Sequence, residues 1–506
     1  MNRKRSGLAL TASLAMVVTT MTVLSQPAQA EELATRAADR AGMALAQSPD
    51  ESFHRSATTL GAAGLFYSSY QRTYRGLDVV GGDAVIVTDG KGTVHDQITA
   101  DTARINVGTR PSLSANTATD IARKHLSSVD KTSQRLVVAA GERPALAYEV
   151  TLDGQAAEQV PSRMHVLVDA QSGAVLDSWD EVKAGTGNSF YNGNPVTINT
   201  QQSGSTFSTI DPTRNGVRCG RSSNQQVFTG PDDNWGNGSG TDLETACVDA
   251  LYAAQRQWDM LRDWLGRNGI DGNGRGFPAL VGLAAVNAFW NGSTASFGRS
   301  QDGQRQVVPM DVVAHEFGHG IFQFTPGGSG GGGNEKGGLN ESTGDIFGAL
   351  TEHFANNPND PPDYEVGEEV NLVGRGPIRS MYQPSRLNHP NCYSSSIPNT
   401  EVHAAAGPQN HWFYLLAEGT NPGGGKPVSP TCNNTTITGI GIQKAGQIFY
   451  NGLLRKTATW THARARVATL QAAKALFPGS CTEFNVTKAA WAAVSVPAQA
   501  GEPACP

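Results

Sequence analysis

The sequence predicts an α+β protein with more than one domain. Its 506 residues exceed the usual length of one compact domain, so two or three domains are expected. Residues 31–184 mix strand-like and helical patterns, and residues 185–241 are rich in strand-like segments and turn residues. From Leu243 onward helical periodicity prevails. We therefore expect an α+β region, then a β-rich region, then a mainly helical region.

The composition narrows the possible functions. Hydrophobic residues make up 38% and charged residues 17%, which is typical of a folded chain rather than a disordered one. The net charge of -6 offers no basic excess to neutralise phosphates. We expect no nucleic-acid partner and no binding to an anionic membrane.

The N-terminus resembles a secretory signal peptide. Residues 2–5 are mostly basic, an apolar run follows from Gly7 to Leu24, and residues 28–30 read Ala-Gln-Ala, a small-x-small cleavage pattern. The alternative is an uncleaved anchor helix, which the threonines in the run disfavour. We expect a signal peptide over residues 1–30 and a secreted, extracellular protein that leaves the membrane after cleavage.

Export changes how the cysteines are interpreted. An even number in a secreted chain favours disulfides, and the pairing is open. We expect nearest neighbours to pair. A thiolate zinc site is the alternative, but no C-x-x-C spacing supports it. The expected pairs are Cys219 with Cys247, Cys392 with Cys432, and Cys481 with Cys505.

Local patterns predict the elements in order. The N-terminal region should contain two strands around a Gly-Gly turn (76–89), a helix (117–126) and a hairpin (164–179). A composition shift near residues 183–187 marks a boundary and a processing point. The Gly-rich run 327–333 reads as a flexible loop, because neither a preceding strand nor a following Lys-Ser/Thr makes it a phosphate loop. Helices are expected over 243–265, 307–324, 339–355, 409–417, 443–454, 462–476 and 486–493.

The strongest chemical signal is the H-E-x-x-H motif at residues 315–319. On a helix the spacing of four places His315 and His319 on one face, where both can bind one Zn²⁺. Glu316 lies beside the metal and can take a proton from an attacking water. The alternative is a pair of solvated helix histidines near a glutamate.

A third ligand is needed for a catalytic zinc site. The following predicted helix offers Glu341, and Asp345 lies four residues further on the same face. Asp345 can accept a hydrogen bond from a ligating imidazole and fix its tautomer. The alternative for Glu341 is a charge that favours the start of its helix.

Together these segments resemble the thermolysin-like zinc metallopeptidases. HEFGH followed by NESTGD carries the resemblance, and further matches extend it from about residue 190 to about 495. These are NAFWNG (287–292), DYEVGE (363–368), RSM (379–381), VH (402–403), GIG (439–441) and IFY (448–450). Residues 31–184 resemble paired pro-domains, and the cysteines suggest an actinobacterial-type, disulfide-containing branch.

The resemblance implies a fold, a site and a mechanism. It implies a two-lobed catalytic domain, with a β-rich lobe (185–320) and a mainly helical lobe (321–506) flanking the active-site cleft. His315, His319 and Glu341 would bind zinc, and Glu316 would be the general base. Asp345 would orient His315. His403 would donate to the oxyanion and Arg379 to a substrate carbonyl. Without the resemblance, His403 would more simply be interpreted as a core histidine and Arg379 as part of a surface ion pair.

The resemblance also implies substrate-binding and calcium residues. Asn287 and Ala288 would hold an extended peptide, and Val312, Val366, Val370 and Ile378 would line the pocket for the residue after the cut. Because all four are aliphatic, we expect cleavage before Leu, Phe, Ile or Val; ordinary core packing is the alternative. Structural Ca²⁺ would be bound by Asp311, Glu352, Asp363, Glu365 and Glu368, whose alternative is a solvated acidic loop.

Three positions depart from the family pattern. No Tyr occurs between His319 and Glu341, where the family places a second oxyanion donor. The family has a carboxylate residue five positions before this histidine, where this chain has Pro398. Glu401 or Asn399 could take the role of that carboxylate beside His403. The residue before Asp345 is Gly344 instead of Ser.

The sequence therefore predicts a secreted zinc endopeptidase that is made as a zymogen. Residues 31–184 would act as an intramolecular chaperone and inhibitor, the substrates would be proteins or peptides, and the enzyme would be a monomer. A zinc hydrolase of a non-protein amide is one alternative, and a non-catalytic, metal-stabilised binding module is another.

Overall fold

The structure is a computed structural model that describes residues 26–60, 64–99, 103–157, 160–180, 182–331 and 333–505. It divides into two compact units, one formed by Met1–Leu152 with His165–Trp179 and the other by Asp153–Met164 with Asp180–Pro506. Most of the predicted signal peptide lies outside the described residues, and its last residues belong to helix α1 (Gln26–Met43). No helix in the described parts of the chain is long and apolar enough to cross a membrane.

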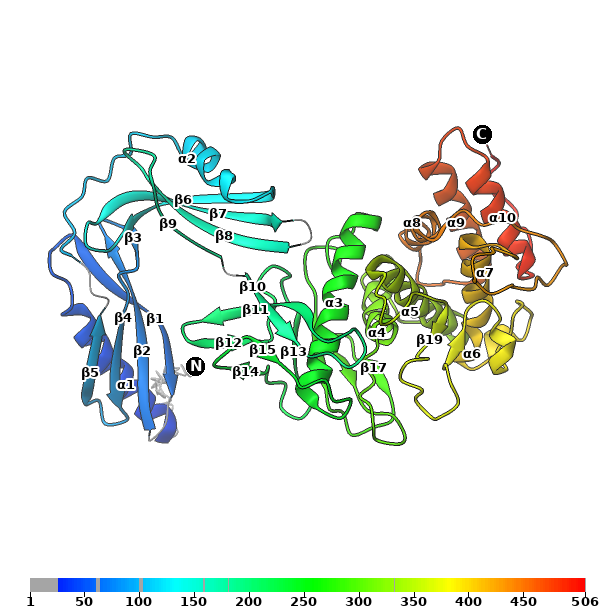
Figure 1. Cartoon of the computed structure of the whole chain (residues 1–506), viewed down its shortest axis with the longest axis horizontal. Helices are drawn as coiled ribbons and strands as arrows, with labels where there is room; N and C mark the ends of the chain where they lie inside the picture. The colour runs from blue at the N-terminus through cyan, green and yellow to red at the C-terminus, as the bar shows by residue number, and fades with distance from the viewer. Residues whose placement is uncertain are drawn as a thin grey trace, which may run out of the picture. The chain divides into compact units, whose positions relative to one another are not determined.

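The first unit is built on a nine-stranded sheet with the order β5-β4-β2-β3-β6-β7-β8-β9, in which β1 also pairs with β2 (Figure 1). The predicted strands around Gly81-Gly82 are β3 and β4, and they pair with different stretches of β2 rather than with each other. The predicted hairpin is confirmed, because β8 and β9 are neighbours. The strands are β1 (Glu51–Leu60), β2 (Leu65–Tyr74), β3 (Leu77–Val80), β4 (Ala84–Asp89), β5 (Val94–Thr99), β6 (Ser128–Ala139), β7 (Ala145–Ala157), β8 (Val160–Asp169) and β9 (Val175–Asp180). The remaining helix, α2, spans Ala115–Ala122.

The β-rich part of the second unit contains two larger sheets. One has the order β14-β12-β11-β10-β15 and the other β13-β16-β18-β17, so β17 lies at an edge. Strand β10 continues across the predicted boundary at residue 185, because it pairs with β11 from Val182 to Gly187. The strands are β10 (Val182–Gly187), β11 (Val196–Ser203), β12 (Thr206–Ser208), β13 (Arg218–Arg221), β14 (Thr229–Gly230), β15 (Asn234–Trp235), β16 (Pro278–Val281), β17 (Ala288–Trp290) and β18 (Ala295–Phe297).

Helices dominate the rest of the second unit, as predicted. Helix α3 begins after Asp242, whose side chain accepts from the Thr245 amide, and ends at Gly266, whose φ of 64° suits glycine. The short strands β19 (Glu365–Val366) and β20 (Arg379–Ser380) pair beside the helices. The helices are α3 (Leu243–Leu265), α4 (Met310–Gln323), α5 (Gly333–Ala355), α6 (Val402–Ala405), α7 (Gly407–Ala417), α8 (Ile442–Leu453), α9 (His462–Leu476) and α10 (Thr482–Ala493).

One apolar core holds this unit together. Helices α3, α4 and α5 pack on one another, and α7 is buried along its whole length between α5, α8 and α10 (Figure 1). Trp412 of α7 stacks on Trp491 of α10 with ring centroids 4.4 Å apart. All six cysteines form disulfides in the expected pairs, 219–247, 392–432 and 481–505. The thiolate zinc alternative is therefore wrong.

Candidate active site

Two glycines let the helices of the predicted zinc site approach closely. His315 and His319 lie on one face of α4 with ring centroids 4.6 Å apart. A Cβ on Gly318 of α4 would lie 2.8 Å from the Cα of Gly344 of α5, and a Cβ on Gly344 would lie 2.4 Å from Nδ1 of His315. The absence of both Cβ atoms therefore allows α5 to press its acidic face against the two histidines.

His315, His319 and Glu341 form a group suited to a metal ion. One ligand atom from each lies within 4.8 Å of the others. Nε2 of His315 is 3.5 Å from Oε2 of Glu341, and Nε2 of His319 is 3.6 Å from Oε1. Two ligands about 2.0–2.1 Å from a tetrahedral zinc lie about 3.3 Å apart, close to these separations. Oε2 of Glu341 is buried without a hydrogen-bond partner among the described residues, so the donor set fits zinc.

Asp345 joins the site to the rest of the helical lobe. Its carboxylate accepts a 2.8 Å hydrogen bond from Nδ1 of His315, which leaves Nε2 free to face Glu341. It also accepts from Nε and Nη2 of Arg379, at 2.7 and 2.6 Å, and from Nδ2 of Asn410 at 2.7 Å. The sequence did not indicate Asn410, because it reaches Asp345 from 65 residues away.

A second asparagine orients the other histidine. Nδ1 of His319 donates to Oδ1 of Asn340 at 3.2 Å, so Nε2 faces the metal position here too. Asn340 directly precedes Glu341, and this adjacency was the available sequence signal.

The histidines differ in charge when no metal is bound. Burial is the largest single influence on His315 and lowers its pKa, but the interactions with Asp345 and Glu341 together outweigh burial and raise this pKa to about 10. Burial, reinforced by the charge of His315, lowers the pKa of His319 to about 4. Since metal ligation needs both imidazoles neutral, zinc binding would displace the proton of His315.

Glu316 is a buried carboxyl group that lines the cleft. Burial raises its pKa to about 7, and the charge of His315 opposes this shift. Its Oε2 is buried and has no hydrogen-bond partner among the described residues. A carboxylate in this state readily exchanges a proton near neutral pH.

Arg379 and His403 lie beside Glu341. Nη2 of Arg379 and Nε2 of His403 are 3.9 and 3.5 Å from its Oε2. Arg379 is buried on β20, and although burial opposes its charge, Asp345 keeps the pKa of the guanidinium above its usual value. Both side chains therefore place a nitrogen atom beside Glu341.

Glu401 forms the hydrogen bond to His403 that the family's carboxylate, replaced here by Pro398, would form. Its Oε1 accepts from Nδ1 of His403 at 2.6 Å, while Oε2 accepts from the amides of His403 and Ala404 at 3.0 and 3.3 Å. The same carboxylate thus caps α6 and orients the imidazole. Asn399, the other alternative, lies in the preceding 3₁₀ turn.

A cleft of about 790 Å³ joins these groups to the predicted peptide-binding residues. Asn287 and Ala288 lie on one wall, where β17 has a free edge. The predicted pocket residues Val312, Val366 and Ile378 line the cleft. Val370 is fully buried and does not line it, whereas Leu372 and His389 do, and the sequence did not indicate either.

A second acidic cluster lies further along α5. Glu352, Asp360 and Glu368 bring one oxygen each within 4.8 Å of the others. Burial first, and then mutual repulsion with Asp311 and Asp363, raises the pKa of Asp360 to about 8 and that of Glu368 to about 10. Oxygens of Asp311, Glu352, Asp360 and Glu368 are buried without hydrogen-bond partners among the described residues.

The cluster differs from the predicted calcium set at two positions. Asp360 belongs to it and was missed. The carboxylate of Glu365 is instead bonded to Nη1 of Arg386 at 2.6 Å and to the Tyr382 hydroxyl at 2.9 Å. Because side chains alternate along a strand, Val366 of β19 faces the cleft while Glu365 faces the other way.

Two lysines hold the Gly-rich loop between α4 and α5. Nζ of Lys336 donates to the carbonyls of Gly327, Gly330 and Ala458, at 3.1, 2.6 and 3.0 Å. Nζ of Lys456 donates to the carbonyl of Gly328 at 2.6 Å and lies 4.1 Å from the centre of the Phe322 ring. The described part of the loop, predicted to be flexible, is thus held by internal ammonium groups.

Comparisons with known proteins agree with this architecture. The family described as thermolysin metallopeptidase, catalytic domain, matches residues 184–323, and its alpha-helical domain matches residues 333–496. The fungalysin/thermolysin propeptide motif matches residues 54–96.

Curated relatives point the same way. The chain is 31% identical to a thermolysin of Alicyclobacillus acidocaldarius over 84% of this chain and 83% of that protein. It is 39% identical to the transglutaminase-activating metalloprotease of Streptomyces mobaraensis over 86% of this chain, but the match spans only 59% of that relative's length. A bacillolysin of Bacillus caldolyticus is 33% identical over 70% of this chain and 68% of that protein.

The fold and site define a metallopeptidase with a β-rich and a helical catalytic domain. The chain belongs to the thermolysin family: it is a zinc metalloendopeptidase with a propeptide, made as a zymogen. This membership favours an enzyme over the non-catalytic binding module.

Proposed function

We propose that this enzyme is a secreted endopeptidase that cleaves proteins before large apolar residues. The observation that supports it best is the ligand triad, in which three donors from two helices have the separations of a tetrahedral zinc site and adjoin a peptide-sized cleft. A bound zinc would polarise the scissile carbonyl and acidify the attacking water.

The chain's own residues would carry the remaining steps. Glu316 takes a proton from the attacking water and returns it to the leaving amine. His403, whose Nδ1 donates to Glu401, would carry a proton on Nε2 as well and donate from Nε2 to the oxygen on which negative charge develops. Arg379, fixed by Asp345, donates to a neighbouring substrate carbonyl. The free edge of β17, with Asn287 and Ala288, adds the substrate backbone as a further strand.

Specificity follows from the wall beside Arg379. Val312, Val366 and Ile378 are apolar, line the cleft and carry no charge that would bind a polar side chain. Leu372 extends this surface. We expect cleavage before Leu, Phe, Ile or Val, which bury the most apolar area there.

The second acidic cluster is proposed to bind Ca²⁺. Four buried carboxylate oxygens without partners need a cation, and hard oxygen donors suit calcium rather than zinc. The donors would be Asp311, Glu352, Asp360, Asp363 and Glu368, with Glu365 excluded by its bond to Arg386.

The remaining parts of the chain are assigned by the same proposal. Residues 1–30 direct export and are removed, and residues 31 to about 181 assist folding and inhibit the enzyme. The first processing bond should lie before Val182, because cutting at residue 185 would divide β10. The lobes would be 182–320 and 321–506, and the mature enzyme would act outside the cell as a monomer.

A cleavage assay tests the central proposal. The full chain and its Glu316→Gln variant are expressed in a secreting host and mixed with an unfolded protein, and new N-termini are mapped by mass spectrometry. Cuts before Leu, Phe, Ile or Val are expected, lost in the variant and with a zinc chelator.

A matched control separates the chemistry from general damage. Glu244→Gln keeps an acceptor for the Gly236 amide, so it should retain full activity. Cuts placed mainly before Lys, Asp or Gly would contradict the proposed specificity. Equal activity of wild type and Glu316→Gln would contradict the mechanism.

A further inference from the structure

His389 is a cleft residue for which the proposed mechanism has no role. It lines the cleft together with Arg379 and His403 and is half-buried. Its main-chain amide donates to the carbonyl of Pro384 at 3.1 Å, but no hydrogen bond joins its imidazole to another described residue. An imidazole that faces a peptide-binding cleft with both ring nitrogens available is equipped to bind a ligand.

The surroundings of His389 locate it along the cleft. Burial, and next the charge of Arg379, lowers its pKa, while Asp345 and Glu401 act in the opposite direction. It lines the same cleft as Arg379 and His403 and as Ala288 to Trp290 of the edge strand β17. At neutral pH it is an uncharged donor and acceptor, which suits the amide and carbonyl groups of a peptide.

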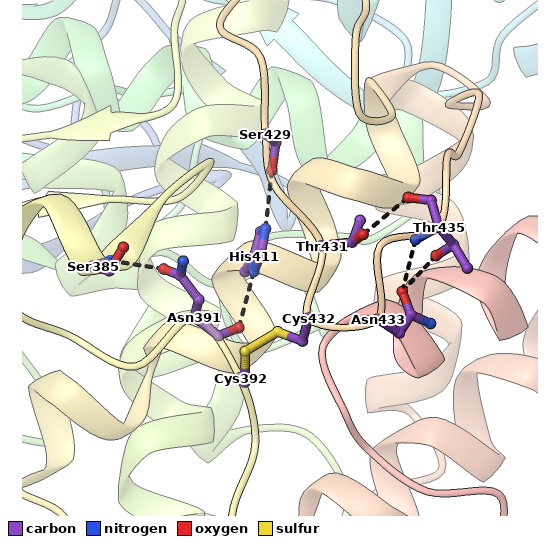
Figure 2. The surroundings of a disulfide bond; sticks show 9 residues. All are labelled: Ser385, Asn391, Cys392, His411, Ser429, Thr431, Cys432, Asn433 and Thr435. Carbon is purple, nitrogen blue, oxygen red and sulfur yellow. Dashed lines mark hydrogen bonds between the residues drawn. A yellow bond between two sulfur atoms is a disulfide. The ribbon is translucent and has the colours of Figure 1, made fainter.

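The loop that carries His389 is braced from several directions. Oδ1 of Asn391 accepts from the Ser385 amide at 2.7 Å, and its carbonyl accepts from Nδ1 of buried His411 at 2.9 Å (Figure 2). Nε2 of His411 shares a 2.9 Å hydrogen bond with the hydroxyl of Ser429. Cys392, which follows Asn391 in the chain, is joined by a disulfide to Cys432.

This bracing fixes the backbone near His389 at little further entropic cost when a substrate binds. A pre-organised polar group on a rigid wall is typical of a subsite residue, whereas a surface histidine has no such support.

We propose that His389 is a substrate-binding residue that hydrogen-bonds the backbone of the second residue after the scissile bond. Arg379 is assigned to the carbonyl of the first residue after the cut, and His389 lines the same cleft near enough to feel the charge of Arg379, so the next backbone group of the substrate is the one assigned to it. The proposal rests on the proposed endopeptidase function and adds a preference for substrates that extend at least two residues past the cut.

Two peptides test this assignment. They share their residues up to a leucine after the cut; one ends there as an amide, and the other continues for two alanines. The processed enzyme and its His389→Ala and His389→Gln variants are compared by kcat and KM on both. His389→Ala should lose roughly three- to tenfold in kcat/KM on the longer peptide, mainly through KM, as expected for one neutral hydrogen bond. It should change less than twofold on the shorter peptide, and His389→Gln should recover part of the loss.

A control in the same loop isolates the imidazole from the loop's shape. Asn391→Ala removes the bond to the Ser385 amide but leaves its own carbonyl for His411. A loss caused by loop movement would appear in Asn391→Ala and affect both peptides. Equal losses on both peptides in His389→Ala, or none, would overturn the proposal. A loss confined to kcat on both would assign His389 to the oxyanion instead. If wild type cleaves neither peptide while retaining zinc, the endopeptidase proposal itself fails.

Discussion

Helix α5 carries acidic residues into two buried sites that neutralise charge in opposite ways. Near its middle, Glu341 and Asp345 meet His315 and Arg379, and despite burial these cations hold the pKa of both carboxyls well below their usual values. Two turns later, Glu352 enters a cluster in which burial and other carboxylates raise its pKa. The first site is largely organised by the protein's own cations, whereas the second has none among the described residues and must be neutralised by protons or by a cation from solution. The metals should therefore serve different purposes: zinc for chemistry and calcium for the fold.

The largest expected effect is the loss of activity without loss of fold at the first site. Glu341→Gln removes one zinc ligand but leaves the pairing of Asp345 with His315 and Arg379 intact. Losing a Lewis acid worth several kcal/mol should reduce kcat/KM by on the order of a thousandfold. The test measures zinc content, activity and melting temperature of this variant and of the wild type, all in the presence of calcium. A variant that loses its fold in parallel with its zinc would break the distinction between the sites.

The second prediction is that calcium removal destabilises the fold. Calcium at about one hundred times its dissociation constant would add about 2.7 kcal/mol, or several degrees in melting temperature. The cluster's donors come from α4, α5 and the segment around Asp360 and Glu368, so losing calcium loosens contacts between segments distant in sequence. Glu368→Gln sharpens the test, since it should raise the melting temperature in a chelator and lower it in calcium. The same sign in both conditions would contradict a cation site.

The calcium-free protein should also become less stable as pH rises. Burial first, and then neighbouring carboxylates, raises the folded-state pKa to about 6 for Asp311, about 8 for Asp360 and about 10 for Glu368. Unfolded carboxyls titrate near pH 4, so the folded state holds more protons between about pH 4 and 10. The free energy of unfolding should therefore fall through that window in chelator. Urea unfolding of the Glu316→Gln variant, which avoids self-digestion, measures this, and calcium should largely abolish the slope.

The two sites also differ in how far the sequence predicts them. Helical spacing alone brings His315 and His319 together, and one turn of α5 separates Glu341 from Asp345, so local periodicity sufficed. Asp360 and Glu365 lie in irregular segments and a two-residue strand, where one step reverses the side-chain direction. The sequence therefore could not separate a cation ligand from a partner of Arg386.

The sequence did not predict the longer-range contacts either, for a similar reason. Asn410 and His389 reach the site through the packing of α7 and a disulfide-braced loop, and no spacing encodes either. In the first unit the strands flanking Gly81-Gly82 were identified, but their separate pairing with β2 depends on the whole sheet. Which residue takes the place of the family's carboxylate at Pro398 depends on the conformation of the turn before α6, and the sequence alone allows Glu401 or Asn399.

A smaller effect is expected at Glu401, the carboxylate that orients His403. Glu401→Gln can still cap α6 through its amide oxygen, but it loses the charged partner of Nδ1 of His403. We expect about a tenfold loss of kcat, the lower end for a charge-assisted hydrogen bond, because the carboxylate is 63% exposed. In a His403→Ala background the same change should have no further effect. Additive losses would show that Glu401 acts on something other than His403.

The smallest expected effect concerns the Gly-rich loop, which uses internal cations where the acidic cluster needs an external one. Lys336→Met leaves three carbonyls without their shared donor, while Lys456→Met leaves one. The glycines and Ala458 that carry these carbonyls are exposed or half-buried, so each lost hydrogen bond should cost about 0.5–1.5 kcal/mol net; Lys336→Met should lower stability by about 1–3 kcal/mol and Lys456→Met by less. Removing the buried charge of Lys456, whose pKa burial lowers to about 7, offsets part of its lost bond. Denaturant unfolding ranks the two, and because neither lysine contributes to the calcium cluster, both losses should be the same with and without calcium.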